Sequence, residues 1–242
     1  MTAESQLTSV RILRAFVKLG FQPLTRGKKA NLTRQRLDGE SVKRLFDVLF
    51  SLSVLVFFSP VYLILALIIA ISSPGPVFYI QERVGKDHKH FGCIKFRTMV
   101  ENADEVLEDL IATSPQMRTE FEDNFKLRHD PRITWIGKFL RVTSLDEFPQ
   151  FWNVLMGDMS VVGPRPLVPE ELPKYGLDID KVLTIRPGIT GLWQVSGRNN
   201  IPYDRRVKID VYYVNSQNFW LDLLLIVKTI GVVLFTKNNG AC

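Results

Sequence analysis

The sequence has few cysteines and histidines, which excludes two common kinds of small domain. Cys93 and Cys242 are its cysteines, and His88, His90 and His129 are its histidines. Two cysteines cannot build a disulfide framework or a cysteine-based zinc site, and the histidines lack the spacing of metal ligands. The composition therefore excludes structural zinc and fits a reducing cytoplasm.

Acidic residues are outnumbered: 31 Lys and Arg stand against 25 Asp and Glu, for a formal net charge of +6. A basic chain suits a nucleic acid, an anionic membrane surface or a phosphorylated substrate, so charge alone leaves all three open. Residues 1–40 form a basic N-terminal arm, in which residues 10–21 could line one side of an amphipathic helix on lipid. A solvated, disordered tail is the alternative.

Charge almost disappears over residues 45–71, where only Asp47 is ionised. About 27 residues would reach roughly 40 Å as a straight helix, enough for a hydrocarbon core of about 30 Å. However, Lys43 and Arg44 precede the segment and five more cations follow it by residue 97, so both flanks are expected on the cytoplasmic side. Length permits a span, whereas the flanks favour a segment that returns.

A break at Ser59 and Pro60 offers a way to return. Proline removes an intrahelical hydrogen bond and clashes with the preceding turn, and the Ser59 hydroxyl can satisfy a freed carbonyl. We therefore predict a re-entrant helix-break-helix over residues 41–74, with a simple span as the alternative.

Beyond residue 74 the apolar pattern predicts a mixture of strands and helices, and hence an α/β fold. Residues 133–141 fit core packing, the default, or a helix at the lipid headgroups. Residues 157–202 are rich in Gly and Pro and are expected to be dominated by loops. We expect strands at 77–83 and 91–97, amphipathic helices at 102–113, 117–126 and 148–156, and a second membrane-associating helix at 219–235.

Asp146 and Glu147 place two adjacent carboxylates just before a predicted helix. Ser144 and Glu147 fit the capping box S-x-x-E, so on local sequence alone structural capping is the preferred interpretation. A helix start also presents N–H groups to phosphate, so a carboxylate there could attack phosphorus, and two carboxylates could hold Mg²⁺. Downstream, Arg165 and Arg186 lie beside Gly-Pro turns, where a planar guanidinium suits phosphate oxygens.

Taken together and in order, these segments resemble the monotopic phosphoglycosyl transferases, also called bacterial sugar transferases. So many ordered motifs outweigh the capping interpretation. The matching stretches are KRLFD at 43–47, SP at 59–60, KFRTM at 95–99, SLDE at 144–147, GDMS at 157–160, GPRP at 163–166 and RPGITG at 186–191.

The resemblance implies an architecture and a location. It implies a compact α/β catalytic domain over residues 75–236, with residues 237–242 as a C-terminal tail. This domain would lie on the membrane surface, seated by the re-entrant helix-break-helix and by interfacial amphipathic helices. The expected location is the cytoplasmic face of the bacterial inner membrane.

The resemblance also implies a two-step reaction that begins polysaccharide or glycoconjugate synthesis, such as exopolysaccharide or O-antigen. Asp146 would attack the diphosphate of a UDP-sugar and release UMP, with Mg²⁺ bound at Asp146 and Glu147. Polyprenyl (undecaprenyl) phosphate would then attack the phosphosugar-aspartyl intermediate. The expected enzyme is an undecaprenyl-phosphate hexose-1-phosphate transferase.

Other residues take roles by the same resemblance. Asp158 is a candidate for organising the metal or its loop. Residues 191–199 resemble members that transfer galactose- or glucose-1-phosphate, a likeness that does not identify the sugar. The candidates for substrate contact are Lys95, Arg97, Arg141, Asp158, Arg165, Arg186 and Arg198.

Two other functions compete with the transferase. A membrane adaptor would use the basic arm and apolar segments on anionic lipid, but it leaves the Gly-Pro-Arg motifs unexplained. A membrane phosphohydrolase would use the same aspartyl chemistry with water as acceptor. The expected partners are a UDP-sugar, polyprenyl phosphate and the membrane, with no nucleic acid; formation of a homodimer is left open.

Overall fold

The computed structural model describes residues 29–124, 127, 129–197 and 201–235. The predicted helix at residues 10–21, the candidate Arg198 and the tail at 237–242 lie outside them. The helices are α2 (Lys29–Phe57), α3 (Ser59–Ser72), α4 (Ala103–Thr113), α5 (Pro115–Asn124), α6 (Trp135–Thr143), α7 (Gln150–Met156), α8 (Ile179–Val182), α9 (Tyr203–Ser216) and α10 (Phe219–Phe235). The strands are β1 (Phe78–Val84), β2 (His90–Phe96), β3 (Ser160–Val162) and β4 (Gly188–Thr190), and the 3-10 segments are η1 (Lys86–His88), η2 (Leu145–Glu147) and η3 (Pro169–Asp178).

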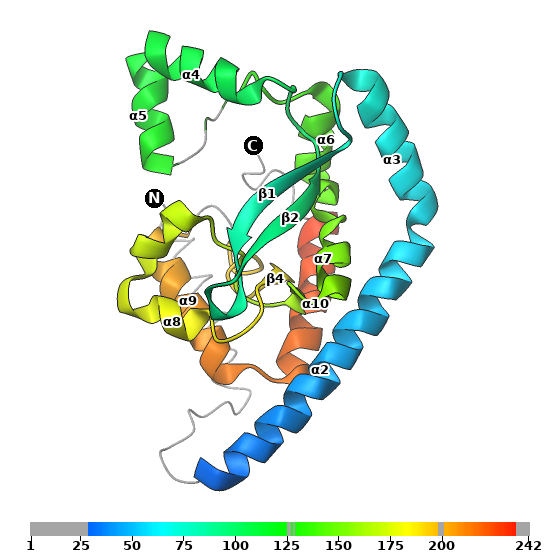
Figure 1. Cartoon of the computed structure of the whole chain (residues 1–242), viewed down its shortest axis with the longest axis vertical. Helices are drawn as coiled ribbons and strands as arrows, with labels where there is room; N and C mark the ends of the chain where they lie inside the picture. The colour runs from blue at the N-terminus through cyan, green and yellow to red at the C-terminus, as the bar shows by residue number, and fades with distance from the viewer. Residues whose placement is uncertain (1–28, 125–126, 128, 198–200, 236–242) are drawn as a thin grey trace.

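Helices α2 and α3 form one long element that runs along the side of the molecule and bends by 62° at Phe58 (Figure 1). The break is where the sequence predicted it. Pro60 cannot donate to the carbonyl of Val56, and the Ser59 hydroxyl donates to that carbonyl instead, at 2.8 Å. Within the described residues no single helix is long and apolar enough to cross a membrane, whereas this bent pair passes that test together.

The start of α2 differs from the prediction. The helix begins at Lys29 and not near residue 41, so the last part of the predicted basic arm continues into the bent element.

Strands β1 and β2 form the predicted antiparallel hairpin, one residue away from the expected bounds. Tyr79 pairs with Lys95, and Gln81 pairs with Cys93. Since directly opposed residues share a face and alternate residues repeat it, this face of the hairpin also carries Arg83. The side chains of Tyr79, Gln81, Arg83 and Lys95 and the Cys93 thiol therefore point to one side of the ribbon.

Helix α6 confirms the prediction of core packing on one side, whereas its place at lipid headgroups stays a prediction. Thr134 caps it by accepting a hydrogen bond from the backbone N–H of Gly137 at 3.0 Å. One side of α6 packs on α3, where Leu65, Ile69, Phe96, Ile136 and Leu140 form a buried cluster. The other side exposes apolar groups, with Trp135 at 69% and Phe139 at 50% of their full accessible area.

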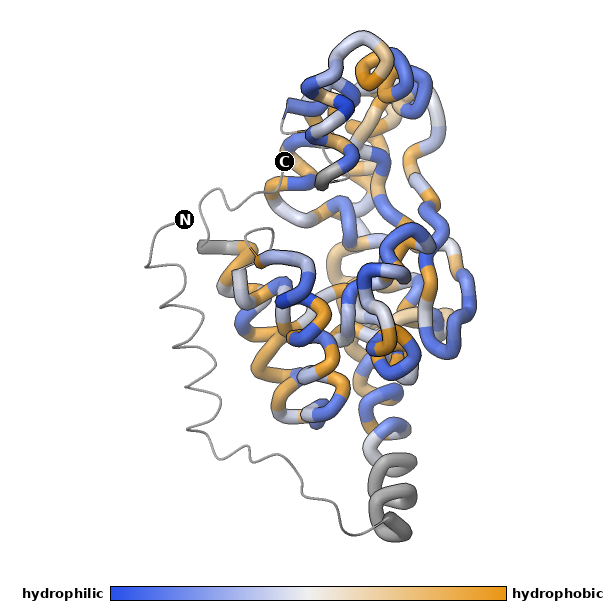
Figure 2. The backbone as a smooth tube through the Cα atoms, turned by 90° about the vertical axis from the view of Figure 1, so that its left-hand side faces the viewer, coloured by the Kyte–Doolittle hydropathy of each residue, from blue (hydrophilic) through white to orange (hydrophobic). Residues whose placement is uncertain are grey.

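The largest buried cluster surrounds a short parallel pair, β3 and β4, which the loop prediction for residues 157–202 missed. The two strands approach too closely for side chains: a Cβ on Gly188 would overlap the backbone nitrogen of Gly163. Helices α7, α9 and α10 pack around this pair. Helix α10 has the bounds predicted from sequence and is apolar along most of its length (Figure 2).

Candidate active site

The acid pair lies on a tight connection between α6 and α7. Ser144 ends α6 in the left-handed conformation, with φ of 58°, and its side chain makes no capping hydrogen bond. Asp146 and Glu147 then lie on the single 3-10 turn η2, and α7 begins three residues later. The predicted capping box therefore does not form, and the two carboxylates remain available for chemistry.

Cationic groups surround Glu147. Its Oε1 atom lies 3.0 Å from the Nζ atom of Lys95 and 4.0 Å from the Nη1 atom of Arg165. The same side chains line a small cavity together with Arg83 and Gln194. It holds about 10 Å³, which is space for about one water-sized group such as a phosphoryl oxygen.

Arg83 was missed as a site residue by sequence reasoning. It is buried, and its Nη1 atom donates to the carbonyl of Pro166 at 3.0 Å, next to Arg165. The signal was present in the hairpin: once the two predicted strands are paired, Arg83 falls on the same face as Lys95.

The pKa values of the two carboxylates are shifted in opposite directions. Burial, followed by the negative charge of Glu147, raises the pKa of Asp146 to about 6, against the opposing charges of Lys95 and Arg141. Burial alone would raise the pKa of Glu147 as well, but the charges of Lys95 and Arg165 hold it below its usual value. At neutral pH both groups are ionised, and Asp146 is the more basic of the two.

Arg141 and Arg97 have defined partners on the framework. The Nε atom of Arg141 donates to the Thr98 hydroxyl at 3.0 Å, and its charge is close enough to lower the pKa of Asp146. Arg97 is buried and donates to the carbonyls of Ser73 and Pro74, at 2.7 and 2.6 Å. Arg97 therefore fixes the loop after α3, and its contact with substrate stays a prediction.

Asp158 and Arg186 lie at the far end of α7 from the acid pair. The Oδ2 atom of Asp158 accepts from the Asn153 amide at 3.3 Å. Arg186 donates from Nε to the carbonyl of Gly157 at 2.8 Å, and its Nη1 atom lies 3.3 Å from Glu40. The side chains of Asp158 and Arg186 thus hold the turn after α7. The structure places Lys95, Arg141 and Arg165 near the acid pair, but not Asp158 and Arg186.

The chemistry of the acid pair fits Mg²⁺. Within the described residues no group of three or more His, Cys, Asp or Glu side chains gathers as a metal cage. Mg²⁺ does not need one, because it is commonly held by one or two carboxylates together with substrate phosphates. Asp146 and Glu147 supply such a pair, so they could hold the ion once a diphosphate is present.

Comparison with known proteins identifies the family of the chain. The bacterial sugar transferase profile matches residues 39–236. The UDP-galactose-lipid carrier transferase of Erwinia amylovora is 48% identical over 200 residues, which cover 83% of this chain and 41% of that protein. The undecaprenyl-phosphate galactose phosphotransferase of Salmonella typhimurium is 50% identical over 200 residues, with the same coverage of 83% and 41%.

A shorter relative matches over nearly its whole length. The exopolysaccharide production protein ExoY of Rhizobium meliloti is 44% identical over 201 residues, covering 83% of this chain and 89% of ExoY. The chain thus spans about two fifths of the first two relatives and most of this one. On the profile match and these identities, the chain belongs to the bacterial sugar transferase family.

Proposed function

We propose that this chain transfers a sugar-1-phosphate from a UDP-sugar to polyprenyl phosphate, with Asp146 as the nucleophile. The observation that carries the proposal is the acid pair on η2, where a basic carboxylate lies beside one that is held ionised by Lys95 and Arg165. A nucleophile must be ionised and basic, and a diphosphate needs cations; η2 supplies the carboxylate, and Lys95 on β2 and Arg165 after β3 supply the cations beside it.

In the first step an oxygen of Asp146 attacks the phosphorus that bears the sugar. A bond forms between that oxygen and phosphorus, and the bond to the oxygen bridging the two phosphates breaks. UMP leaves with the bridging oxygen and its electron pair. Lys95, Arg165 and Arg83 supply positive charge around the diphosphate, and this charge opposes repulsion between the anionic nucleophile and its anionic target.

In the second step a phosphate oxygen of the polyprenyl carrier attacks the same phosphorus. The aspartyl oxygen leaves with its electron pair, which regenerates the carboxylate and gives polyprenyl-diphosphate-sugar. Mg²⁺ held by Asp146 and Glu147 would supply charge neutralisation for the diphosphate. The bent pair α2 and α3 exposes apolar side chains such as Leu63 and Leu67, and it offers a place for the lipid-borne acceptor to approach from a membrane.

The first donor to test is UDP-galactose, because the relatives from Erwinia amylovora and Salmonella typhimurium are named for galactose. An adaptor needs no cations around an acid pair, so the geometry favours an enzyme. A phosphohydrolase would use the same dyad, and only the dependence on an acceptor separates it from a transferase.

The test measures UMP release by the detergent-purified chain from UDP-galactose, UDP-glucose and UDP-N-acetylglucosamine, with and without undecaprenyl phosphate and Mg²⁺. We expect multiple turnovers only with the lipid, and at most one UMP per enzyme without it. Asp146→Asn should abolish release, whereas Asp180→Asn, a matched change of an exposed aspartate, should not. Multiple turnovers without lipid would establish the hydrolase, and an active Asp146→Asn variant would remove Asp146 from its role.

A further inference from the structure

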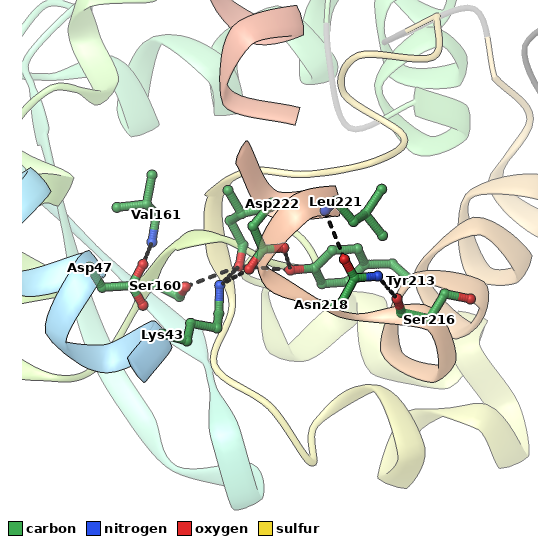
Figure 3. A network of polar contacts seen from close by, with 10 residues as sticks. Lys43, Asp47, Ser160, Val161, Tyr213, Ser216, Asn218, Leu221 and Asp222 are labelled. Atoms are coloured by element: carbon green, nitrogen blue, oxygen red, sulfur yellow. Dashed lines mark hydrogen bonds and ion pairs between the residues drawn. The ribbon is translucent and has the colours of Figure 1, made fainter. Parts of the chain in front are cut away.

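Two charged residues on the bent helix face the catalytic domain. Lys43 and Asp47 lie one turn apart on α2 and point toward β3 (Figure 3). Asp47 is 2% exposed, and the side chain of Lys43 is 18% exposed. Burying charge is costly unless each charge is paired or hydrogen-bonded, so their partners should reveal why they are there.

Their partners are backbone groups of β3. The Oδ1 atom of Asp47 accepts from the backbone N–H of Val161 at 3.1 Å. The Nζ atom of Lys43 donates to the carbonyl of Val162 at 3.0 Å. Strand β3 pairs with β4 at Ser160 and Val162, so the Val161 N–H faces away from β4. There Asp47 on α2 accepts from it, and Lys43 holds the carbonyl at the end of the strand.

A second layer holds Lys43 in place. Its Nζ atom also lies 2.6 Å from Oδ2 of Asp222, on α10. The other oxygen of Asp222 accepts from the hydroxyl of Tyr213, on α9, at 2.6 Å, and this hydroxyl lies 3.1 Å from the Val162 carbonyl. Figure 3 shows the resulting network, in which three helices, α2, α9 and α10, converge on the end of β3.

The end of β3 leads directly to the catalytic site. Arg165 follows Val162 by three residues, through Gly163 and Pro164. Hydrogen bonds to β4 hold this short path: Gly163 N–H donates to the Thr190 carbonyl at 2.9 Å, and Gly188 N–H donates to the Pro164 carbonyl at 2.7 Å. The path has little slack, so a shift of Val162 would move Arg165 relative to Glu147.

We propose that Lys43 and Asp47 are positioning residues for Arg165, acting by holding the Val161–Val162 backbone from the bent helix. They touch no substrate; they set the 4.0 Å approach of Arg165 to Glu147. This inference rests on the proposed function and extends it, because it gives a residue-level role in the site to the helix that carries the apolar surface. The motif at residues 43–47 thus has a task in the site as well as in the anchor.

A contribution to stability alone is the competing interpretation, and a thermodynamic cycle separates the two. The Lys43→Met/Asp222→Asn variant removes both charges of the Lys43–Asp222 ion pair, so neither partner is left buried without the other. We expect kcat/KM for the best donor to fall roughly 10- to 100-fold, as for a misplaced binding group. In an Arg165→Met background the same double change should cause no further loss, because its effect passes through Arg165.

The matched control is another buried ion pair, Asp130 and Arg132, whose oxygen and nitrogen atoms also lie 2.6 Å apart. The Arg132→Met/Asp130→Asn change can lower kcat/KM by any factor. Because this ion pair does not touch β3, that factor should be the same in the wild-type chain and in the Arg165→Met background. If Lys43→Met/Asp222→Asn also lowers kcat/KM by the same factor in the wild-type and Arg165→Met backgrounds, the positioning role is wrong.

Asp47 provides a second and conservative test. Asp47→Asn keeps an oxygen for the Val161 N–H, whereas Asp47→Leu removes it. We expect Asp47→Asn to retain most of the activity and Asp47→Leu to lose it. Equal loss in both variants would show that charge, not the hydrogen bond to β3, matters, and it would overturn the proposal.

The hold of Lys43 and Asp47 on the Val161–Val162 backbone, here called the clamp, can be tested by hydrogen exchange without measuring activity. In Lys43→Met/Asp222→Asn and Asp47→Leu, deuterium uptake should rise in peptides covering residues 160–166, while peptides from the β1–β2 hairpin should be unchanged. Unchanged uptake at residues 160–166 would contradict the clamp. If the wild-type chain released no UMP, the proposed function would fail on that result alone, and exchange would still decide whether α2 holds β3.

Discussion

At the residue scale, Asp146 and Glu147 are neighbours in the chain but have different surroundings. Burial dominates at Asp146 and raises its pKa, whereas at Glu147 the effect of burial is outweighed by the charges of Lys95 and Arg165, which together lower the pKa. Pairs of titratable groups whose surroundings shift their pKa values in opposite directions commonly have separate roles in catalysis. Here the division suits a basic nucleophile beside a fixed anion that organises the cations.

Another buried acid, Asp210, lies outside the acid pair. Asp210 on α9 is 1% exposed; Oδ2 accepts from the Tyr175 hydroxyl at 2.8 Å, and among the described residues Oδ1 has no hydrogen-bond partner. Burial raises its pKa to about 7, despite the opposing hydrogen bond from Tyr175 and the charges of Arg206 and Arg165. The folded state therefore keeps a proton on Asp210 that the unfolded chain, with a pKa of 3.8, releases earlier.

Asp210→Asn should therefore stabilise the fold at high pH. Because the folded pKa is raised, the wild-type contribution is largest below pH 4 and is lost as pH rises toward and through 7. We expect Asp210→Asn to raise the unfolding free energy at pH 8 by about 2–4 kcal/mol and to change it little at pH 4.5. Thermal unfolding in detergent at both pH values measures this, with Asp180→Asn as the exposed control; equal shifts at both would contradict it.

Several site residues could be predicted from sequence, and the reason some could not is visible in their contacts. Lys95 and Arg165 were recognisable because they stand in short motifs whose chemistry suits phosphate, and the structure places both at Glu147. Arg97 and Arg186 stand in similar motifs, yet their guanidinium groups bind backbone carbonyls. Residue type and spacing do not distinguish an arginine that binds a phosphate from one that binds a carbonyl.

At the scale of elements, the bend between α2 and α3 has more than one cause. Pro60 removes one helical hydrogen bond and its ring clashes with the preceding turn, which together cost a straight helix about 3 kcal/mol. Straightening would also uncover Phe96, Ile136 and Leu140, at about 1.5–3 kcal/mol for each large side chain brought into water. It would further pull the end of α3 from Arg97 and Tyr62 from the carbonyl of Phe148. Packing outweighs the proline.

Pro60→Leu alone should therefore keep the bend. A pair of spin labels at the exposed positions Leu49 and Leu67 would report the angle, after Cys242 is changed to serine; Cys93 is fully buried and should not label. We expect the distance distribution of Pro60→Leu to match that of the wild type. A longer distance in Pro60→Leu alone would show that proline sets the bend.

The matched variant adds polar groups to the packed side. Pro60→Leu combined with Leu65→Ser and Ile69→Ser removes the two α3 side chains that cover Phe96 and Leu140. In that variant the distance between the labels should lengthen. An unchanged distance would place the cause in the loop that follows α3, where Arg97 binds.

Elements with a clear period were predictable, and the others were not. The hairpin and α10 show alternation or a long apolar run, and their bounds were predicted to within one residue. Strands β3 and β4 are three residues each, and their pairing joins segments separated by a region with several turns. Such short parallel strands carry no usable period, and Gly188 reads as a turn although it lies in a strand.

At the scale of the whole molecule, exposed tryptophans mark the apolar surface. Trp135 on α6, Trp152 on α7 and Trp220 on α10 are 69%, 53% and 73% exposed, whereas Trp193 is 5% exposed. Large exposed aromatic groups are unusual on a surface that faces only water, and tryptophan is enriched where membrane meets water. We therefore extend the proposed function to a membrane seat that includes both α6 and α10.

Quenching by lipid can test that seat. Variants that keep one tryptophan each, at position 135, 220 or 193, would be reconstituted into vesicles containing brominated phosphatidylcholine. Emission from Trp135 and Trp220 should be quenched, and emission from the buried Trp193 should serve as the unquenched control. If neither Trp135 nor Trp220 were quenched, the membrane contact would be confined to α2 and α3.

The clamp on β3 also sets an order of events during synthesis. Lys43 and Asp222 are 179 residues apart in the chain, so at roughly 5–20 residues per second the lysine waits about 10–40 s for its partner to be made. Helix α2 thus exists before β3, α9 and α10, with its two buried charges unpaired. On the proposed membrane seat, α2 would reach the membrane first, and the catalytic domain would then assemble onto a helix that is already in place. On the proposed positioning role, the strand leading to Arg165 would acquire its full support only when α10 has been translated, so the site would be completed after the helix is anchored.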